Sequence, residues 1–252
     1  MGCLDRYIAW KLLQGWILVW LVMSAIFGLL AFIEELDRVT EHYQTLDALQ
    51  FVLYTLPQRS MELAPVIILL GSLRGPHDAG IYAIVARAAA FVVFLSAAAN
   101  MVLAPRIAAL YRVGDMDSLQ RLLTAASRRV FFISLPLAIV FLVAARPLLV
   151  FLYGADYAGG AWPLTILTLG YLSTLFAGFT VVVANMTGHE KATLVSIGIS
   201  LGLNIVLNLA LIPIYGMKGS AIATGTSLVA FNAFQWLQVR RRIGLGPSVL
   251  GF

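Results

Sequence analysis

Arg87 and four side-chain amides are the residues of this sequence whose types and positions could bind a polar ligand inside a membrane. Asn204 and Asn208 lie one helical turn apart, and Asn232 and Gln235 share a second helix face. An arginine within an apolar stretch is costly, so it faces a cavity or a partner, or it reaches the membrane surface with its long side chain. The amides can hydrogen-bond sugar hydroxyls or join neighbouring helices. Ligand binding and helix packing therefore both stay open for these residues.

No pattern typical of an enzyme occurs in the sequence. It contains no Gly-x-x-x-x-Gly-Lys-Ser/Thr phosphate loop, no nucleophile elbow and no paired carboxylates inside the apolar runs. His189 and Glu190 have the types of metal ligands, but a third ligand at a useful spacing is missing, so we expect them to cap helices. Cys3 is the only cysteine, which excludes an internal disulfide. We expect no catalytic residue, no metal and no cofactor.

The composition indicates the elements that must position these residues. Of the 252 residues, 61% are hydrophobic and 12% are charged, which is typical of an integral membrane protein. The apolar runs are long and lack the period-two alternation of barrel strands. The expected fold is therefore all-α, a polytopic membrane helix bundle. The net charge of +5 is explained by basic residues in cytoplasmic loops, so a nucleic-acid partner is not expected.

We expect about six to seven transmembrane helices and one amphipathic surface helix. A helix of roughly 20 apolar residues crosses a bilayer. Residues 47–73 either span the membrane or dip into it, because Arg59 and Glu62 interrupt them. Residues 106–129 carry leucines at helical spacing among arginines, which predicts the surface helix. The expected spans are about 12–33, 79–104 (ending at Pro105), 130–152, 162–184, 192–213 and 220–238.

The distribution of basic residues predicts the orientation. One side of the membrane would carry Arg106, Arg112, Arg121, Arg128, Arg129, Lys191, Arg240, Arg241 and Arg242. The loops expected on the opposite side, 153–161 and 214–219, carry only Lys218. Because lysine and arginine collect on the cytoplasmic side, we expect a cytoplasmic C-terminus. The side of the N-terminus stays open.

From about residue 69 onward, five motifs resemble the polysaccharide flippase family of the multidrug/oligosaccharidyl-lipid/polysaccharide exporter superfamily, the Wzx-type lipid-linked oligosaccharide flippases. The motifs are residues 75–87 (GPHDAGIYAIVAR), 103–111 (LAPRIAALY), 185–190 (NMTGHE), 204–216 (NIVLNLALIPIYG) and 219–224 (GSAIAT). The resemblance implies that residues 71–252 form the C-terminal lobe of a flippase with a central cavity. It also implies that Arg87 binds the diphosphate of a lipid-linked sugar. The N-terminal lobe is absent, so a missing partner lobe or a homo-oligomer is implied.

Residues 1–70 instead resemble the N-terminus of the lipopolysaccharide-export permeases of the LptF/LptG type. The motifs are residues 4–8 (LDRYI), 32–36 (FIEEL), 54–57 (YTLP) and 62–71 (ELAPVIILLG). Both resemblances imply a multi-pass protein of the bacterial inner membrane. Three hypotheses stay open: a flippase-related transporter of lipid-linked oligosaccharide precursors, a permease subunit of a lipopolysaccharide-export ABC transporter, and a recombined or truncated chain without transport activity of its own.

Overall fold

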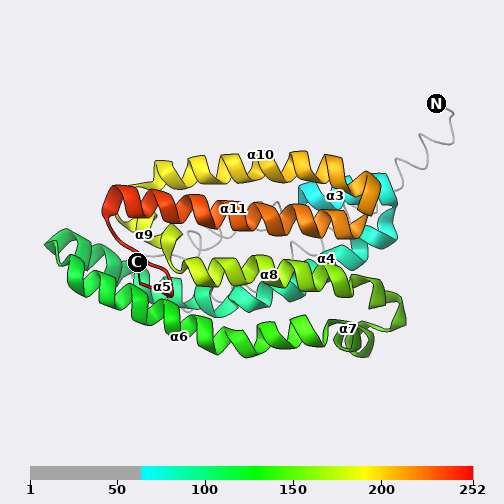
Figure 1. Cartoon of the computed structure of the whole chain (residues 1–252), viewed down its shortest axis with the longest axis horizontal. Coiled ribbons are helices and arrows are strands. Elements are labelled where there is room, and N and C mark those ends of the chain that lie inside the picture. Colours follow the sequence, from blue (N-terminus) through cyan, green and yellow to red (C-terminus); the bar gives the residue numbers. More distant parts are fainter. Residues whose placement is uncertain (1–63, 252) are drawn as a thin grey trace, which may run out of the picture. The chain divides into compact units, whose positions relative to one another are not determined.

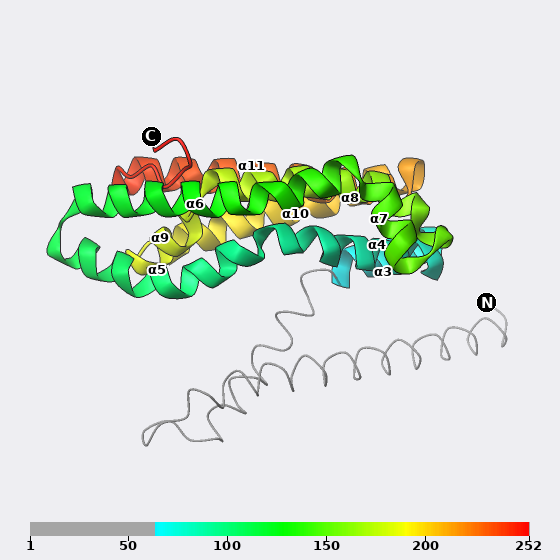
Figure 2. The same ribbon diagram turned by 90° about the horizontal axis from the view of Figure 1, so that it is seen from below.

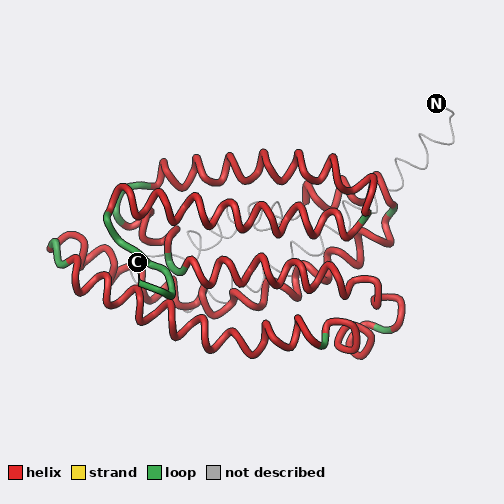
Figure 3. Tube along the Cα trace, in the orientation of Figure 1, coloured by secondary structure: helices red, strands yellow, loops and turns green. Residues whose placement is uncertain are grey.

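The computed structural model describes residues 64–251, and these residues form helices joined by short loops (Figure 1, Figure 3). The chain divides into two compact units, Met1–Pro65 and Val66–Phe252, and the described residues lie almost entirely in the second. The expected all-α helix bundle is confirmed for the described residues, which contain no strand. The span expected at 12–33, Cys3 and most of the ambiguous stretch 47–73 lie outside the described residues.

The described helices follow one another with few connecting residues. Figure 2 shows α6 and α11 along one side of the unit and α3, α4 and α5 along the other. In chain order the elements are α3 (Ala64–Arg74), α4 (Pro76–Ala90), the 3₁₀ turn η1 (Phe91–Val93), α5 (Phe94–Val113), α6 (Met116–Val143), α7 (Ala145–Tyr153), the 3₁₀ turn η2 (Ala155–Gly160), α8 (Ala161–Ala177), α9 (Thr180–Met186), α10 (Glu190–Tyr215) and α11 (Met217–Ile243).

Within residues 64–251, four helical stretches are long and apolar enough to cross a membrane. They are Pro76–Val113, Met116–Val143, Ala155–Ala177 and Glu190–Tyr215. The span expected at 220–238 lies in α11, which has the length but a less apolar composition. The buried side of α11 consists largely of glycine, alanine, serine, asparagine and glutamine, because this helix packs between α8 and α10. Small residues suit such an inner helix of a membrane bundle, since they let backbones approach closely.

The prediction of a separate surface helix over residues 106–129 is wrong. The helix of the preceding span does not stop at Pro105 but continues to Val113 as α5. Gly114, with φ 78°, then reverses the chain, and Asp115 caps α6 by accepting a hydrogen bond of 2.9 Å from the backbone N–H of Ser118. The arginine-rich segment is thus a helical hairpin, with its first half in α5 and its second half in α6.

Two expected spans are each divided by a break. The span expected at 162–184 consists of α8 and α9, which are separated at Gly178 and Phe179. The span expected at 130–152 consists of the second half of α6 and the separate helix α7, divided at Ala144. The spans expected at 79–104 and 192–213 correspond to α4–α5 and α10, both longer than predicted.

One end of the unit, the basic end, holds the α5–α6 turn, the α9–α10 loop and the last turn of α11 (left in Figure 1). The α3–α4 turn, α7, η2 and the α10–α11 turn lie at the opposite end. All of the basic residues that the sequence assigned to one side belong to segments that lead to the basic end. The opposite end carries Arg74 and Arg146 in addition to Lys218. The asymmetry is therefore smaller than predicted but keeps its sign.

Helix α3 packs within the second unit, although residues 62–71 carry the last permease-like motif. Leu70 is completely buried. The Arg74 guanidinium donates hydrogen bonds to the carbonyl oxygens of Ile212 (3.3 Å) and Pro213 (2.5 Å) at the end of α10. Carbonyls at a helix C-terminus lack partners within the helix, so a cation placed there satisfies them. The compact unit thus begins before the boundary at 70/71 expected from the motifs.

Candidate functional site

A chain of hydrogen bonds joins α4, α10 and α11 near the α10–α11 turn. The Tyr82 and Thr224 hydroxyls are 2.9 Å apart, and the Asn204 amide donates to Thr224 Oγ1 at 3.4 Å. Asn208 donates to the side-chain oxygen of Asn204 at 3.0 Å and accepts from the Ser220 hydroxyl at 2.9 Å. Tyr82 and Ser220 are fully buried. These contacts tie α11 to both α4 and α10.

Two further amides join α11 to its neighbours closer to the basic end. Asn232 donates to the hydroxyls of Ser173 (3.0 Å) and Thr174 (2.9 Å) on α8. Gln235 has no exposed surface; its Oε1 accepts from the Ser196 hydroxyl at 2.6 Å, and its Nε2 donates to Thr193 Oγ1 at 2.8 Å. Both partners of Gln235 lie on α10.

The structure therefore places Asn208, Asn232 and Gln235 in the interior of the bundle, with their amides engaged by other helices. Asn204 is half-buried beside them. In a membrane, where water does not compete, such side-chain bonds hold helices in register. A sugar could reach these amides only if α10 or α8 moved away from α11. Their proposed role in sugar binding stays a prediction, and in this conformation they are helix contacts.

Glycines allow the close helix approach on which those bonds depend. A Cβ on Gly219 would collide with the carbonyl of Leu211, and a Cβ on Gly170 would lie 3.0 Å from the Cα of Gly225. The α10–α11 and α8–α11 pairs are thus packed backbone to backbone. Nothing in the described residues lies within 4 Å of a Cβ built on Gly198 or Gly202.

Arg87 is in a different environment from the four amides, because its side chain is exposed at the surface of the described unit. It lies in the last turn of α4, just before the 3₁₀ turn η1. Along the chain the nearest charged residues are Asp78 and Arg106. Arg87 is about 12 Å along the helix beyond Ala79, at ~1.5 Å per residue, so a span that starts at Ala79, as the sequence predicts, would place it close to the middle of a hydrocarbon layer of roughly 30 Å.

The surface around Arg87 is amphiphilic. Helical spacing places exposed Gly80 before it and Phe91 and Phe94 after it, and the last two are 62% and 66% exposed. Met101 continues this stripe on α5 and is 65% exposed. One cation among small and large apolar side chains matches a ligand that combines an anionic group with a hydrocarbon chain.

The loop before α10 shows no geometry for a metal. His189 occupies the N-cap position of α10 without a side-chain cap bond, and its Nδ1 lies 3.2 Å from Thr187 Oγ1. The expected capping by His189 is therefore wrong. Between residues 64 and 251, no three His, Cys, Asp or Glu side chains gather closely enough to hold a metal ion.

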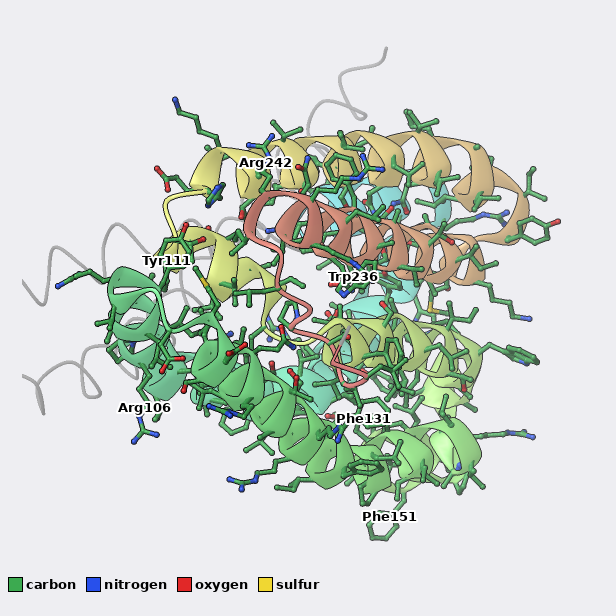
Figure 4. The ribbon with its side chains drawn as sticks, turned by 60° about the vertical axis from the view of Figure 1, so that its left-hand side comes forward. Arg106, Tyr111, Phe131, Phe151, Trp236 and Arg242 are labelled. Atoms are coloured by element: carbon green, nitrogen blue, oxygen red, sulfur yellow. The ribbon has the colours of Figure 1, made fainter. Side chains whose placement is uncertain are left out.

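Sequence reasoning missed two sets of residues. Tyr82, Ser220 and Thr224 complete the network of Asn204 and Asn208, and the recurrence of polar residues along one face of α11 was the available signal. The residues that hold the C-terminal segment on α6, beginning with Gln120, had no local pattern, because their partners are about 120 positions away. Figure 4 shows Arg106 and Phe151 directed away from the bundle.

In the comparison with known proteins, two different family models match successive parts of the chain. The family model for the lipopolysaccharide export system permease LptF/LptG matches residues 6–78, and the model for the lipid II flippase MurJ matches residues 81–250. The lipid II flippase MurJ of Bacillus subtilis (strain 168) is 25% identical over 162 residues, which is 63% of this chain and 30% of that protein. No solved structure matches.

These matches refine the expected resemblance. The flippase family found is MurJ, which is related to the Wzx-type flippases named from the motifs and belongs to the same superfamily. The chain spans about a third of the length of the relative that it matches, so it holds part of such a flippase. Since the flippase model matches residues 81–250, which is more than half of the sequence, the chain belongs to the lipid II flippase MurJ family.

Proposed function

We propose that residues 66–252 form one lobe of a flippase that moves a lipid-linked sugar diphosphate across the bacterial inner membrane without changing it chemically. One observation carries this proposal: Arg87 lies in an apolar helical stretch, with its side chain exposed on an amphiphilic surface beside Phe91 and Phe94. Membership of the lipid II flippase family supplies the substrate class, a lipid-linked precursor.

The position of Arg87 favours contact with an anion. A charged side chain at the centre of a helix costs about 2.5–3.5 kcal/mol to insert, so it is retained where it contacts a partner or a wet cavity. A guanidinium offers paired donors that match the geometry of a phosphate. We therefore assign Arg87 to the diphosphate and the apolar stripe with Phe91 and Phe94 to the lipid chain.

The lobe requires a complement to enclose a cavity. The matched residues correspond to 30% of the relative, and the exposed face of α4 and α5 combines Arg87 with Phe91, Phe94 and Met101. We propose that a partner lobe or a second copy of this chain covers the amphiphilic face of α4 and α5. We propose that the basic end and the C-terminus face the cytoplasm, and the excess of arginine and lysine at that end supports this orientation.

Reconstitution tests this function. The full chain is placed in proteoliposomes that contain a fluorescent polyprenyl-diphosphate sugar, and protection of the label from an impermeant quencher is followed over time. The proposal predicts that the protein accelerates exchange between leaflets relative to empty liposomes. Equal rates with and without the purified, folded protein would favour the hypothesis of a recombined or truncated chain.

The match of residues 6–78 to the permease model supports a second candidate, a subunit of a lipopolysaccharide-export ABC transporter. Such a subunit must receive force from an ATPase. It predicts that the chain, expressed with an affinity tag in a bacterial host, co-purifies with an ATPase in stoichiometric amount. Autonomous flipping together with no bound ATPase would exclude this candidate.

A further inference from the structure

Residues 244–251, the C-terminal strap, leave α11 and cross α6 beside the break between α8 and α9 (red in Figure 1). The strap has no helical hydrogen bonds along most of its length, yet Leu245, Ser248 and Val249 are 4%, 4% and 8% exposed. A short irregular segment buried to this degree must receive its backbone hydrogen bonds from elsewhere in the fold.

Helix α6 provides most of these bonds along one face. The Gln120 amide binds Gly246 twice: its Nε2 donates to the Gly246 carbonyl at 2.8 Å, and its Oε1 accepts from the Gly246 N–H at 2.9 Å. The Ser127 hydroxyl donates to the Pro247 carbonyl at 2.7 Å, and Arg128 Nε donates to the Val249 carbonyl at 2.9 Å. The strap is therefore held by side chains rather than by secondary structure.

The strap also completes the broken end of α8. The Val249 N–H donates to the Phe176 carbonyl at 3.1 Å, a group that the break leaves without a helical partner. Gly178, with φ 73°, forms the break, and a Cβ there would collide with the Pro247 carbonyl and lie 2.5 Å from Ser127 Oγ. Strap, α6 and the α8–α9 break thus meet at one point, backbone against backbone.

We propose that the strap is a releasable latch that holds the α8–α9 break against α6, and that transport requires its release. The requirement of release for transport rests on the proposed flippase function, whereas the latch itself does not depend on that function. Each hydrogen bond from the strap to α6 or α8 is made by a side chain or is a single backbone bond, so the strap can leave while α6, α8 and α11 stay folded. Segments of this kind open before the helices that carry them. A break between two successive helices, such as the one between α8 and α9, is a point at which a membrane helix can bend.

The position of Thr124 beside Gly251 allows the strap to be cross-linked to α6 by an engineered disulfide. A Cβ built on Gly251 would lie 3.7 Å from the Cβ of Thr124, close to the ~3.8 Å that a disulfide needs. Cys3 is the only native cysteine, so a Cys3→Ser background leaves the Thr124→Cys/Gly251→Cys pair as the only thiols. Gly251 has φ 79°, a conformation that is strained for any side chain, so the oxidised double variant is compared with the same protein after reduction.

Two measurements test the latch. First, oxidation of the Thr124→Cys/Gly251→Cys protein should lower the flipping rate about tenfold or more, because a state that is not populated carries no transport. A reductant should restore the rate. The Thr124→Cys variant alone should flip equally in both conditions. Verified cross-linked protein that flips at the reduced rate would overturn the requirement for release.

Second, the Val249→Cys variant in the Cys3→Ser background reports opening without transport, through its rate of maleimide labelling. Adding Gln120→Ala should raise this rate at least about fivefold, as the loss of three hydrogen bonds to the strap, two with Gly246 and one with the Gly251 carbonyl, predicts. Arg121→Ala, a change at the next residue of α6, should leave the labelling rate unchanged, because the Arg121 side chain bonds to Ser118 of the same helix. Equal labelling in all three proteins would overturn the latch. Absence of flipping in every variant, with labelling still raised by Gln120→Ala, would instead overturn the proposed function.

Discussion

Replacing Gln235 by leucine separates the two roles that its amide could have. The side chain is fully buried and forms two bonds to α10, with Ser196 at 2.6 Å and Thr193 at 2.8 Å. Leucine has a similar volume and no polar atoms, so Gln235→Leu removes both bonds without opening a large cavity. If the amide is a helix contact, the variant should lose stability while the folded fraction keeps its activity.

The size of the loss depends on the two partners. Interhelical side-chain bonds in membranes average about 0.6 kcal/mol, so two bonds amount to ~1.2 kcal/mol. The Ser196 hydroxyl also lies 2.8 Å from the Ala192 carbonyl, so it is not left without a partner. The Thr193 hydroxyl can likewise turn to a carbonyl of the preceding helical turn. We therefore expect Gln235→Leu to lower the free energy of unfolding by about 1 kcal/mol rather than by the larger cost of an orphaned polar group.

Steric trapping or reversible unfolding in mixed micelles measures this difference. Gln238→Leu is the matched control, since Gln238 accepts a bond from Arg242 Nε at an exposed site of the same helix. A double-mutant cycle of Gln235→Leu with Ser196→Ala should give a coupling of about 0.6 kcal/mol. Zero coupling and a loss no larger than that of Gln238→Leu would refute the reasoning. Unchanged stability with lost flipping would favour sugar binding.

Further predictions concern the close helix contact and the α6 cap. Gly219→Ala should destabilise the unit by about 1–3 kcal/mol, because its Cβ would collide with the Leu211 carbonyl. Gly198→Ala is the control and should not destabilise the unit, because no described atom lies within 4 Å of a Cβ at that position. Thermal unfolding in detergent compares the two variants. Hydrogen bonds from the Ser118 N–H and hydroxyl lower the pKa of Asp115 below its ordinary value of 3.8. The cap's contribution is therefore complete above that value and is lost as the pH falls through the lower pKa of the folded protein. Hydrogen exchange in the first turn of α6 should accelerate over that range, and Asp115→Asn should remove the dependence.

The apolar pattern of the sequence was sufficient for the class of fold and for the positions of α4, α10 and α11. It failed where two helices meet within a polar stretch. The leucines and arginines of residues 106–129 have helical spacing on both sides of Gly114, so the stretch resembled one amphipathic helix. The residue pair Gly114 and Asp115 was the missed signal, because a left-handed glycine ends one helix and an aspartate caps the next.

The sequence-based prediction ended a helix at Pro105, where none ends, and missed the helix break at Gly178. Pro105 removes one backbone hydrogen bond, and the membrane helix continues past it, as such helices tolerate. Gly178 divides the span expected at 162–184 because residues 247 and 127 approach its backbone, and this long-range contact has no local pattern. The same reason explains the amides: Asn232 and Gln235 were recognised as polar residues on one helix face, but their partners on α8 and α10 are 39 or more positions away.

The most direct test of the proposed function is the flipping rate of Arg87 variants in proteoliposomes. A charge-assisted bond contributes about 1.5–3 kcal/mol, so Arg87→Ala should slow exchange of a polyprenyl-diphosphate sugar by roughly 10- to 150-fold. Arg87→Lys should recover part of the rate, because lysine keeps the charge but not the paired donors. Arg146→Ala, an exposed arginine at the start of α7, is the control and should flip normally. Normal flipping by folded Arg87→Ala protein would contradict the account.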